Sequence, residues 1–139
     1  MRALSAEVEV HDRPESAASE YAAASDDRIL IVDGIDPAIA EGAGTIGVEL
    51  ANTYPIDTAV IQLGDGALIS GVARWLKART PQPQVVGVCA SGAPAMALIA
   101  DSTGVLVEPA GGAGVAALSR HPGKVTRDRL AVLFTGAAA

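Results

Sequence analysis

The sequence has 139 residues, of which 50% are hydrophobic and 3% aromatic, and its formal net charge is −6. This length and apolar content suit one domain with an aliphatic core. The acidic charge, with no basic stripe and few aromatic residues, argues against nucleic-acid binding. A single cysteine excludes an internal disulfide, and no apolar run approaches a membrane-spanning length. We expect a cytoplasmic protein.

Residues 1–33 predict a strand, a helix and a second strand. Residues 8–10 alternate between apolar and charged side chains, as in a short edge strand. A helix is expected to begin near Pro14, because proline suits the first turn. The continuous apolar run at residues 29–32 predicts a buried strand that ends at Asp33-Gly34.

Residues 34–139 predict alternating helices and strands. Asp36-Pro37 opens a helix whose apolar stripe comprises Ile39, Ala43, Ile46 and Leu50. Glycines 42, 44 and 47 weaken this helix, so it must pack closely against a neighbour. Further strands are expected at residues 58–63, 85–88 and 130–134, and further helices over residues 69–79, 93–100 and 111–119. This order predicts an α/β fold with a three-layer arrangement, in which helices cover both faces of a parallel sheet.

The segment from Leu63 to Gly71 carries the clearest chemical signal. It lies where a strand ends and a helix begins, which is the ligand-binding edge of a parallel sheet. Glycines at positions 64 and 66 allow backbone amides to turn towards an anion at the helix start. The spacing matches neither the dinucleotide fingerprint nor the ATP-type loop. A tight turn without a ligand is the equal alternative, and the charge of Asp65 would oppose a phosphate.

Four segments in order resemble the fold-type-II pyridoxal-phosphate (PLP) enzymes, especially threonine/serine dehydratases (threonine ammonia-lyase and serine racemase-like proteins). The resemblance lies in residues 41–49, 63–73, 104–111 and 130–136, and it extends over nearly the whole chain. It implies a C-terminal-half fragment with a partial tryptophan-synthase-beta-like PLP fold. Residues 1–33 would be a remnant of the small domain, and residues 34–139 a partial large PLP-binding domain.

The resemblance also implies which residues bind the cofactor. The amides of Gly64, Asp65, Gly66, Ala67 and Leu68 would hold the PLP phosphate. Thr135 would stand where a serine or threonine hydroxyl bonds the pyridine nitrogen, and Glu108 would lie near the pocket or serve only a structural role. The family reaction would remove water and ammonia from L-threonine or L-serine to give a 2-oxo acid.

The sequence departs from the family at the lysine that PLP chemistry requires. Its two lysines, Lys77 and Lys124, both lack the Ser-x-Lys motif. We therefore expect no catalytic residue in this chain, non-covalent PLP binding at most, and no activity alone. A family metal site would place Cys89 and Ala95 at ligand positions, so we expect no metal, and Cys89 is expected to be a small buried residue.

Partners and alternatives follow from the missing half of the fold. Uncovered apolar strands predict a homo-oligomer or a complementary chain. The small-molecule ligand in the family would be an amino acid. Two alternatives remain: a non-catalytic phosphate-ligand-binding or assembly domain, and an unrelated α/β domain whose glycine turn is structural.

Overall fold

The computed structural model describes residues 4–53, 55–78, 83–89, 95–125 and 128–136. The chain separates into two compact units, Met1–Val32 and Asp33–Ala139. None of the described helices is long and apolar enough to cross a membrane.

Among the described residues of the N-terminal unit, α1 (Pro14–Ala23) is the one α-helix, and none of its residues is buried. The helix begins at the predicted proline. Arg28 stacks on the ring of Tyr21 at 3.8 Å from the ring centroid and donates a hydrogen bond to its carbonyl. The predicted strands at residues 8–10 and 29–32 are both absent. A strand needs a partner for its amides and carbonyls, and the side chains of Ile29 and Ile31 are 85% and 67% exposed.

The second unit is built on a parallel sheet of three strands, β1 (Thr58–Gln62), β2 (Gln84–Val88) and β3 (Leu130–Val132). The strand order is β2-β1-β3, so β1 is central among the described strands. Thr58 pairs with Gln84 on one side and with Leu130 on the other, and both pairings are parallel. All three strands therefore end at the same edge of the sheet.

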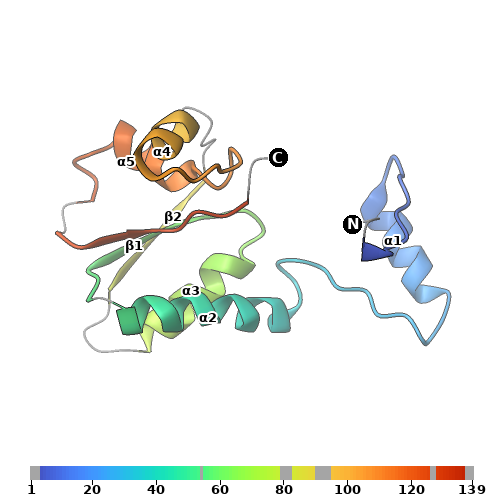
Figure 1. Ribbon diagram of the computed structural model, residues 1–139. Helices are drawn as coiled ribbons and strands as arrows, with labels where there is room; N and C mark the ends of the chain where they lie inside the picture. Colours follow the sequence, from blue (N-terminus) through green and yellow to red (C-terminus); the bar gives the residue numbers. More distant parts are fainter. Residues whose placement is uncertain (1–3, 54, 79–82, 90–94, 126–127, 137–139) are drawn as a thin grey trace. The chain divides into compact units, whose positions relative to one another are not determined.

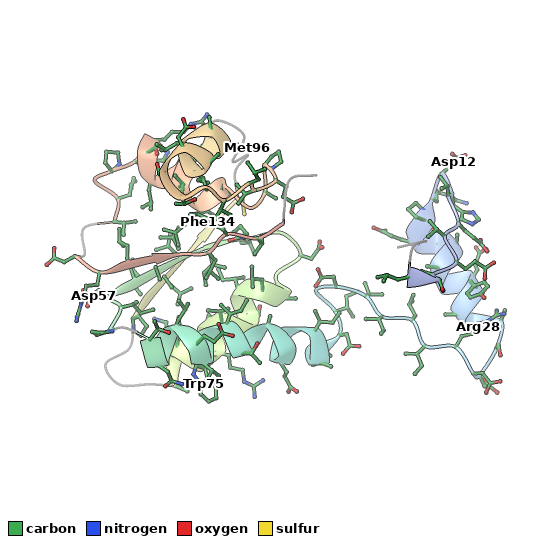
Figure 2. The ribbon with its side chains drawn as sticks, viewed as in Figure 1. Asp12, Arg28, Asp57, Trp75, Met96 and Phe134 are labelled. Atoms are coloured by element: carbon green, nitrogen blue, oxygen red, sulfur yellow. The ribbon has the colours of Figure 1, made fainter. Side chains whose placement is uncertain are left out.

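Helices cover both faces of this sheet (Figure 1). On one side lie α2 (Pro37–Thr53) and α3 (Ala67–Lys77), and on the other lie α4 (Met96–Thr103) and α5 (Ala113–Arg120). Figure 2 shows Trp75 of α3 and Met96 of α4 on opposite sides of the sheet. The predicted three-layer parallel α/β architecture is confirmed.

The core follows the alternation of β1. Ala59 and Ile61 are fully buried and pack with Val72 and Leu76 of α3. Val60 faces the opposite layer and packs with Ala113 of α5. Successive side chains of a strand point to opposite faces, so β1 supplies both layers at once.

Glycines in α2 and α3 allow these two helices to pack closely against each other. A Cβ added at Gly71 of α3 would lie 1.9 Å from the carbonyl oxygen of Ala40, and one at Gly47 would lie 2.9 Å from the Cβ of Trp75. A Cβ at Gly44 would lie 3.3 Å from the Gly71 oxygen, whereas one at Gly42 would meet nothing within 4 Å. The predicted close packing is therefore present at Gly44 and Gly47, and Gly42 has no such contact.

Two further expectations differ from the structure. The predicted buried strand β2 has only Val88 buried, because no described strand covers its outer side. Cys89, which follows it, is exposed, so its predicted burial is wrong. A small side chain at the end of an edge strand has no layer above it to bury it.

Candidate functional site

A cavity of about 320 Å³ lies at the carboxyl edge of the sheet. Strand β1 leads into it through the turn at residues 64–66, and β3 leads into it through residues 133–136. The lining residues come from five separate segments: Asp33, Gln62, Leu63, Gly64, Asp65, Gly66, Ala67, Leu68, Ile69, Val88, Glu108, Ala110, Ala113 and Thr135. Parallel strands ending together bring these distant positions to one place, as expected for ligand sites in such sheets.

The turn at residues 64–66 and the first two residues of α3 form one side of the cavity. Gly66 is the N-cap of α3, has φ of +101°, and makes no side-chain cap hydrogen bond. Among the described residues, no backbone carbonyl accepts a hydrogen bond from the amides of residues 64–68. The preceding amide, at Leu63, instead donates to the carbonyl of Val88 at 2.9 Å. The first amides of a helix carry partial positive charge, so this turn suits an anion.

The two glycines of this turn leave space beside those amides. A Cβ added at Gly64 or Gly66 would meet no atom within 4 Å. The positive φ of Gly66 also disfavours any residue with a side chain. Gly34 lies so close to the turn that a Cβ added to it would be 2.6 Å from the backbone carbonyl oxygen of Asp65. Packing by Gly34 therefore holds the turn from one side, and the glycine positions remain open on the other.

The charges around the cavity oppose an anion. Three carboxylates, from Asp33, Asp65 and Glu108, belong to its lining, and no lysine, arginine or histidine does among the described residues. Among the described residues, attraction for a phosphate must come from backbone amides and neutral polar side chains. Repulsion from three carboxylates lowers the affinity for a dianion. We therefore expect weak binding of phosphate compounds.

Thr135 contributes a hydroxyl that has one protein partner in this region. The side-chain Nε2 of Gln62 donates a hydrogen bond to Thr135 Oγ1. The other amide atom, Gln62 Oε1, is buried and has no partner among the described residues. The pair joins the last residue of β1 to the segment after β3, and both residues line the cavity.

The backbone around Thr135 is fixed by close packing against residues 108–111. The Glu108 amide donates to the Gly136 carbonyl at 2.9 Å. A Cβ at Gly111 would lie 1.7 Å from the backbone carbonyl oxygen of Thr135. A Cβ at Gly136 would lie 2.2 Å from Oε1 of Glu108. Gly136 also has φ of +66°. The hydroxyl is thus held at the cavity by a contact that only glycines permit.

All six residues expected to bind the cofactor, residues 64–68 and Thr135, lie together on this one cavity. Glu108 lies there too. The lysines lie elsewhere: Lys77 Nζ donates to the Pro83 carbonyl at the far end of α3, and Lys124 belongs to a different hollow beside β2. The roles of the lining residues remain predictions, whereas their shared location is observed.

Sequence reasoning missed Gln62 and did not assign Asp33 to the site. Gln62 is a polar residue at the end of a buried strand, two positions before the first glycine of the turn. That position was a usable signal, because a polar side chain at the carboxyl end of a core strand faces the ligand edge.

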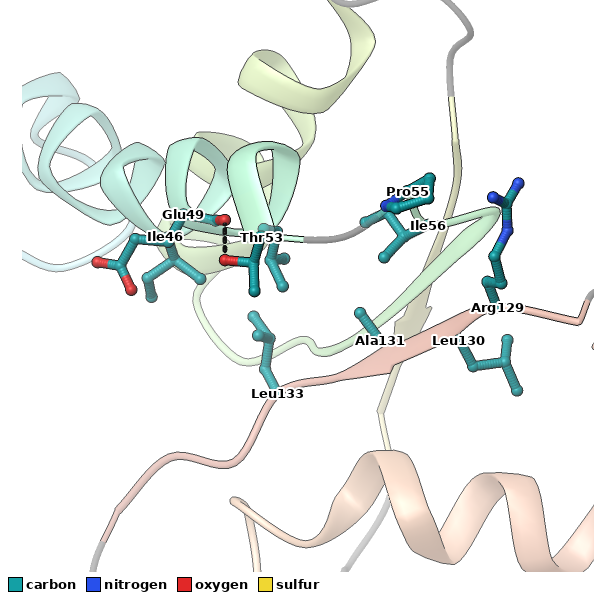
Figure 3. A pocket seen from close by; sticks show the side chains of 10 residues that line it. Ile46, Glu49, Thr53, Pro55, Ile56, Arg129, Leu130, Ala131 and Leu133 are labelled. Carbon is teal, nitrogen blue, oxygen red and sulfur yellow. Dashed lines mark hydrogen bonds between the residues drawn. The ribbon is translucent and has the colours of Figure 1, made fainter.

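A second, larger and mainly apolar hollow of about 600 Å³ lies between α2 and the outer side of β3 (Figure 3). Ile46, Ile56 and Leu133 are among its lining side chains. At one end, Arg129 forms an ion pair with Asp57, with 2.7 Å between Nη2 and Oδ1. The other polar groups there are few, so this hollow suits packing rather than chemistry.

Comparison with known proteins identifies relatives of this chain. Residues 1–100 match the family model described as "Pyridoxal-phosphate dependent enzyme". A 62-residue segment is 39% identical to the L-threonine ammonia-lyase of Thermotoga maritima, covering 44% of this chain and 16% of that protein. The L-threonine dehydratase catabolic TdcB of Escherichia coli strain K12 also matches at 39% over 62 residues, which is 19% of its length.

Solved structures share the fold over nearly the whole chain. The processed threonine deaminase isoform 2 of Solanum lycopersicum superposes with a TM-score of 0.86 at 18% identity, covering 99% of this chain and 55% of that one. An O-acetylserine dependent cystathionine beta-synthase from Helicobacter pylori gives a TM-score of 0.81 at 18% identity, with coverage of 98% and 61%. The chain thus spans little more than half of either structure. At this identity the likeness shows the fold alone, and the family match supplies the relationship: the chain belongs to the fold-type-II pyridoxal-phosphate dependent enzymes, with threonine dehydratases among its relatives.

Proposed function

We propose that this chain binds PLP non-covalently and provides the phosphate-binding turn and ring-nitrogen partner of a threonine/serine dehydratase-like lyase. The observation that carries the proposal is that the amides of residues 64–68, which have no backbone acceptor among the described residues, belong to the same cavity as Thr135. A phosphate needs several donors converging from a turn, and a pyridine nitrogen needs one group some distance away. The lining of the cavity includes candidates for both roles.

The fit to PLP is incomplete in one respect. Neither lysine of the sequence lines the cavity in the described residues. A lysine is the residue that attaches PLP and moves protons in enzymes of this kind. We therefore propose that the chain alone does not catalyse the elimination of water and ammonia from L-threonine or L-serine.

Bound PLP would supply an electron sink for charge that develops on an amino-acid substrate. The chain's own residues would bind and orient it. Amides of residues 64–68 would neutralise part of the phosphate charge, and the uncapped start of α3 would add its dipole. The Thr135 hydroxyl would fix the ring through one hydrogen bond. A protein without the lysine but with this turn would also act as a plain phosphate-ligand-binding or assembly domain, which is the second candidate.

The proposal includes a second polypeptide, either another copy or a complementary chain. Only one side of β3 is paired among the described strands. Leu130 and Phe134 are 40% and 38% exposed, and the apolar hollow lies directly beside β3. An open strand edge next to an apolar surface favours association. A stable monodisperse monomer in light scattering would contradict this part.

The binding proposal is tested by titrating the chain with PLP, and then displacing it with inorganic phosphate. We expect binding that phosphate competes, with no covalent adduct after borohydride reduction and mass spectrometry. Gly66→Ala should lower the affinity for PLP and for phosphate about tenfold or more. The added Cβ enters the open side of the turn, and a residue with a side chain is strained at a positive φ. A covalent adduct on Lys77 or Lys124 would contradict the non-covalent part.

Gly104→Ala is the matched control. Gly104 also has positive φ, of +72°, and an added Cβ there also meets nothing within 4 Å, but it ends α4 away from the cavity. Both variants should lose roughly 1–2 kcal/mol of stability. Only Gly66→Ala should change ligand affinity. If PLP and phosphate both fail to bind the unaltered chain at millimolar concentration, the binding proposal is wrong.

A further inference from the structure

We propose that two copies of this chain associate by pairing their β3 strands antiparallel across a two-fold axis, which joins their two sheets into one. The inference deepens the proposed function, because it names the second polypeptide and the surface that receives it. It rests on the association part of that function and is independent of PLP binding.

The outer side of β3 carries backbone groups that no described strand satisfies. On the inner side, the Leu133 amide donates to the Val60 carbonyl at 3.3 Å, and the Arg129 carbonyl accepts an amide of β1. Odd-numbered residues of this segment therefore face β1. Because the backbone groups of successive strand residues point to opposite sides, the amides and carbonyls of Leu130 and Val132 point to the open edge. An added strand would satisfy them.

The sheet has a second open edge at β2, and the charges beside it oppose pairing between two copies. The hollow along β2 has Arg120 and Lys124 in its lining and, among the described residues, no carboxylate. Two copies that met there would bring like charges together. The hollow along β3 instead carries one charge of each sign, from Glu49 and Arg129. This balance favours β3 as the edge that meets a second copy.

The two charges lie at opposite ends of the β3 hollow (Figure 3). Arg129 lies at the end with Leu130, and Glu49 lies at the end with Leu133. An antiparallel pairing reverses one strand relative to the other, so Arg129 of each copy comes to the Glu49 end of the other. The Arg129 side chain is 55% exposed beside Asp57, so it can also face a second carboxylate. The hollow is therefore complementary in charge to a reversed copy of itself.

The side chains of β3 fit the same arrangement. A two-fold axis at Val132 places Leu133 of one copy opposite Ala131 of the other, so a large side chain lies beside a small one on the face towards α2. On the other face, it places Leu130 opposite Phe134. These two side chains are 40% and 38% exposed, and the pairing would bury both. The same axis thus satisfies the backbone edge and covers its exposed apolar side chains.

The test is amide hydrogen exchange of the isotope-labelled full chain, measured by NMR at two protein concentrations with light scattering of the same samples. We expect the amides of Leu130 and Val132 to exchange more slowly at the higher concentration, because the dimer satisfies them. The Gln84 amide donates to β1, so Val85 and Gly87 face the open side of β2. Their amides are the internal control and should exchange equally fast at both concentrations.

The first variant blocks the edge directly. Leu130→Lys places a charge on the open strand, which is a common means of preventing edge pairing, and it should raise the dissociation constant of the dimer about tenfold or more. Leu98→Lys is the matched control, because Leu98 is 51% exposed on α4, away from β3. It should leave the dissociation constant unchanged. Slow exchange of the Ile61 amide in the central strand reports that each variant is folded.

The second pair of variants tests the charges. Glu49→Lys should raise the dissociation constant about threefold or more, because the new cation meets Arg129 of the other copy. Glu41→Lys changes the net charge by the same amount on the same helix, but Glu41 lines a different hollow, between α2 and α3. It should have no effect on association. Should Leu130→Lys fail to fold, the contrast between Glu49→Lys and Glu41→Lys decides.

The outcomes separate this inference from the rest of the proposed function. A monomer at every concentration overturns it together with the association part, and leaves PLP and phosphate binding untouched. A dimer that protects Val85 and Gly87, but not Val132, overturns the inference alone. Protection of Val132 that is independent of concentration would mean that another segment of the same chain covers the edge, such as residues 29–32, and it would also overturn the inference.

Discussion

Two short apolar runs in this chain have nearly the same sequence character and different structures. Residues 29–32 read Ile-Leu-Ile-Val, and residues 85–88 read Val-Val-Gly-Val. The second run forms strand β2, in register with β1 from Thr58↔Gln84 to Gln62↔Val88. The first run forms no strand, and Ile29 and Ile31 are mostly exposed.

The difference shows that an apolar run forms a strand here when a neighbouring strand can pair with it, and that the strand propensity of its residues is not sufficient. The run at 85–88 even contains a glycine, which weakens a strand. It forms a strand nonetheless, because β1 lies beside it and satisfies its backbone groups. Residues 29–32 consist of good strand formers and belong to a unit in which no described strand can pair with them.

The largest expected effect compares one isoleucine from each region. Ile61→Ala removes a side chain that is fully buried in the core of β1, and it should cost about 2–5 kcal/mol in the free energy of unfolding. Ile31→Ala removes a side chain that is 67% exposed, and it should change stability by less than about 0.5 kcal/mol. Urea denaturation of both variants measures the difference.

Equal losses of unfolding free energy in the two variants would contradict the difference in burial between these two regions. They would mean that residues 29–32 are buried in solution, for example against a second polypeptide. Repeating the denaturation at two protein concentrations distinguishes that case, because stabilisation by association depends on concentration.

Much of the second unit could be predicted from local pattern. The stripe of α2, the apolar strands and the glycine turn each carry a local signal, and each element is present within a few positions of its predicted ends. The order of the strands could not be obtained in this way. Placing β1 between β2 and β3 depends on pairing between segments about 70 residues apart, as in Thr58↔Leu130.

An intermediate effect is expected at the contact between α2 and α3. Gly71→Ala places a Cβ 1.9 Å from the Ala40 carbonyl oxygen, which is backbone and cannot rotate away. The helices must separate, and the expected cost is about 1–3 kcal/mol. Gly42→Ala, within α2, meets nothing within 4 Å and should instead stabilise by about 0.5–1 kcal/mol. Thermal melting of the two variants should therefore shift in opposite directions.

The candidate site was predictable where it depends on local sequence, and not where it depends on contacts between distant segments. Glycines 64 and 66 are visible in the sequence as a glycine pair directly after an apolar strand, and Gly66 has the positive φ that favours glycine. The pairing of Gln62 with Thr135 was invisible, because it depends on the strand order that places β3 beside β1. Of the three carboxylates at the cavity, those of Asp65 and Glu108 were expected there, whereas that of Asp33 was not, because Asp33 lies in a separate segment.

The smallest effect is expected from two polar contacts among the described residues, the ion pair of Asp57 with Arg129 in the second unit and the hydrogen bond of His11 with Glu9 in the first. Asp57 joins Arg129 across 72 residues, with two hydrogen bonds of 3.0 and 2.7 Å, and this contact ties the start of β1 to the start of β3. The Asp57 partner raises the pKa of Arg129 above its ordinary value, so the arginine stays charged at every pH at which the protein is studied. His11 pairs with Glu9, two residues away, and holds no separate elements together.

Asp57→Asn should therefore lower the melting temperature slightly, and Glu9→Gln should leave it unchanged. Surface ion pairs are screened by salt, so the deficit of Asp57→Asn should shrink as sodium chloride is raised from low to molar concentration. A deficit that is independent of salt would assign the loss to strand geometry, because the Asp57 amide also donates to the Arg129 carbonyl. A salt-dependent deficit in Glu9→Gln would show that the N-terminal unit melts together with the sheet.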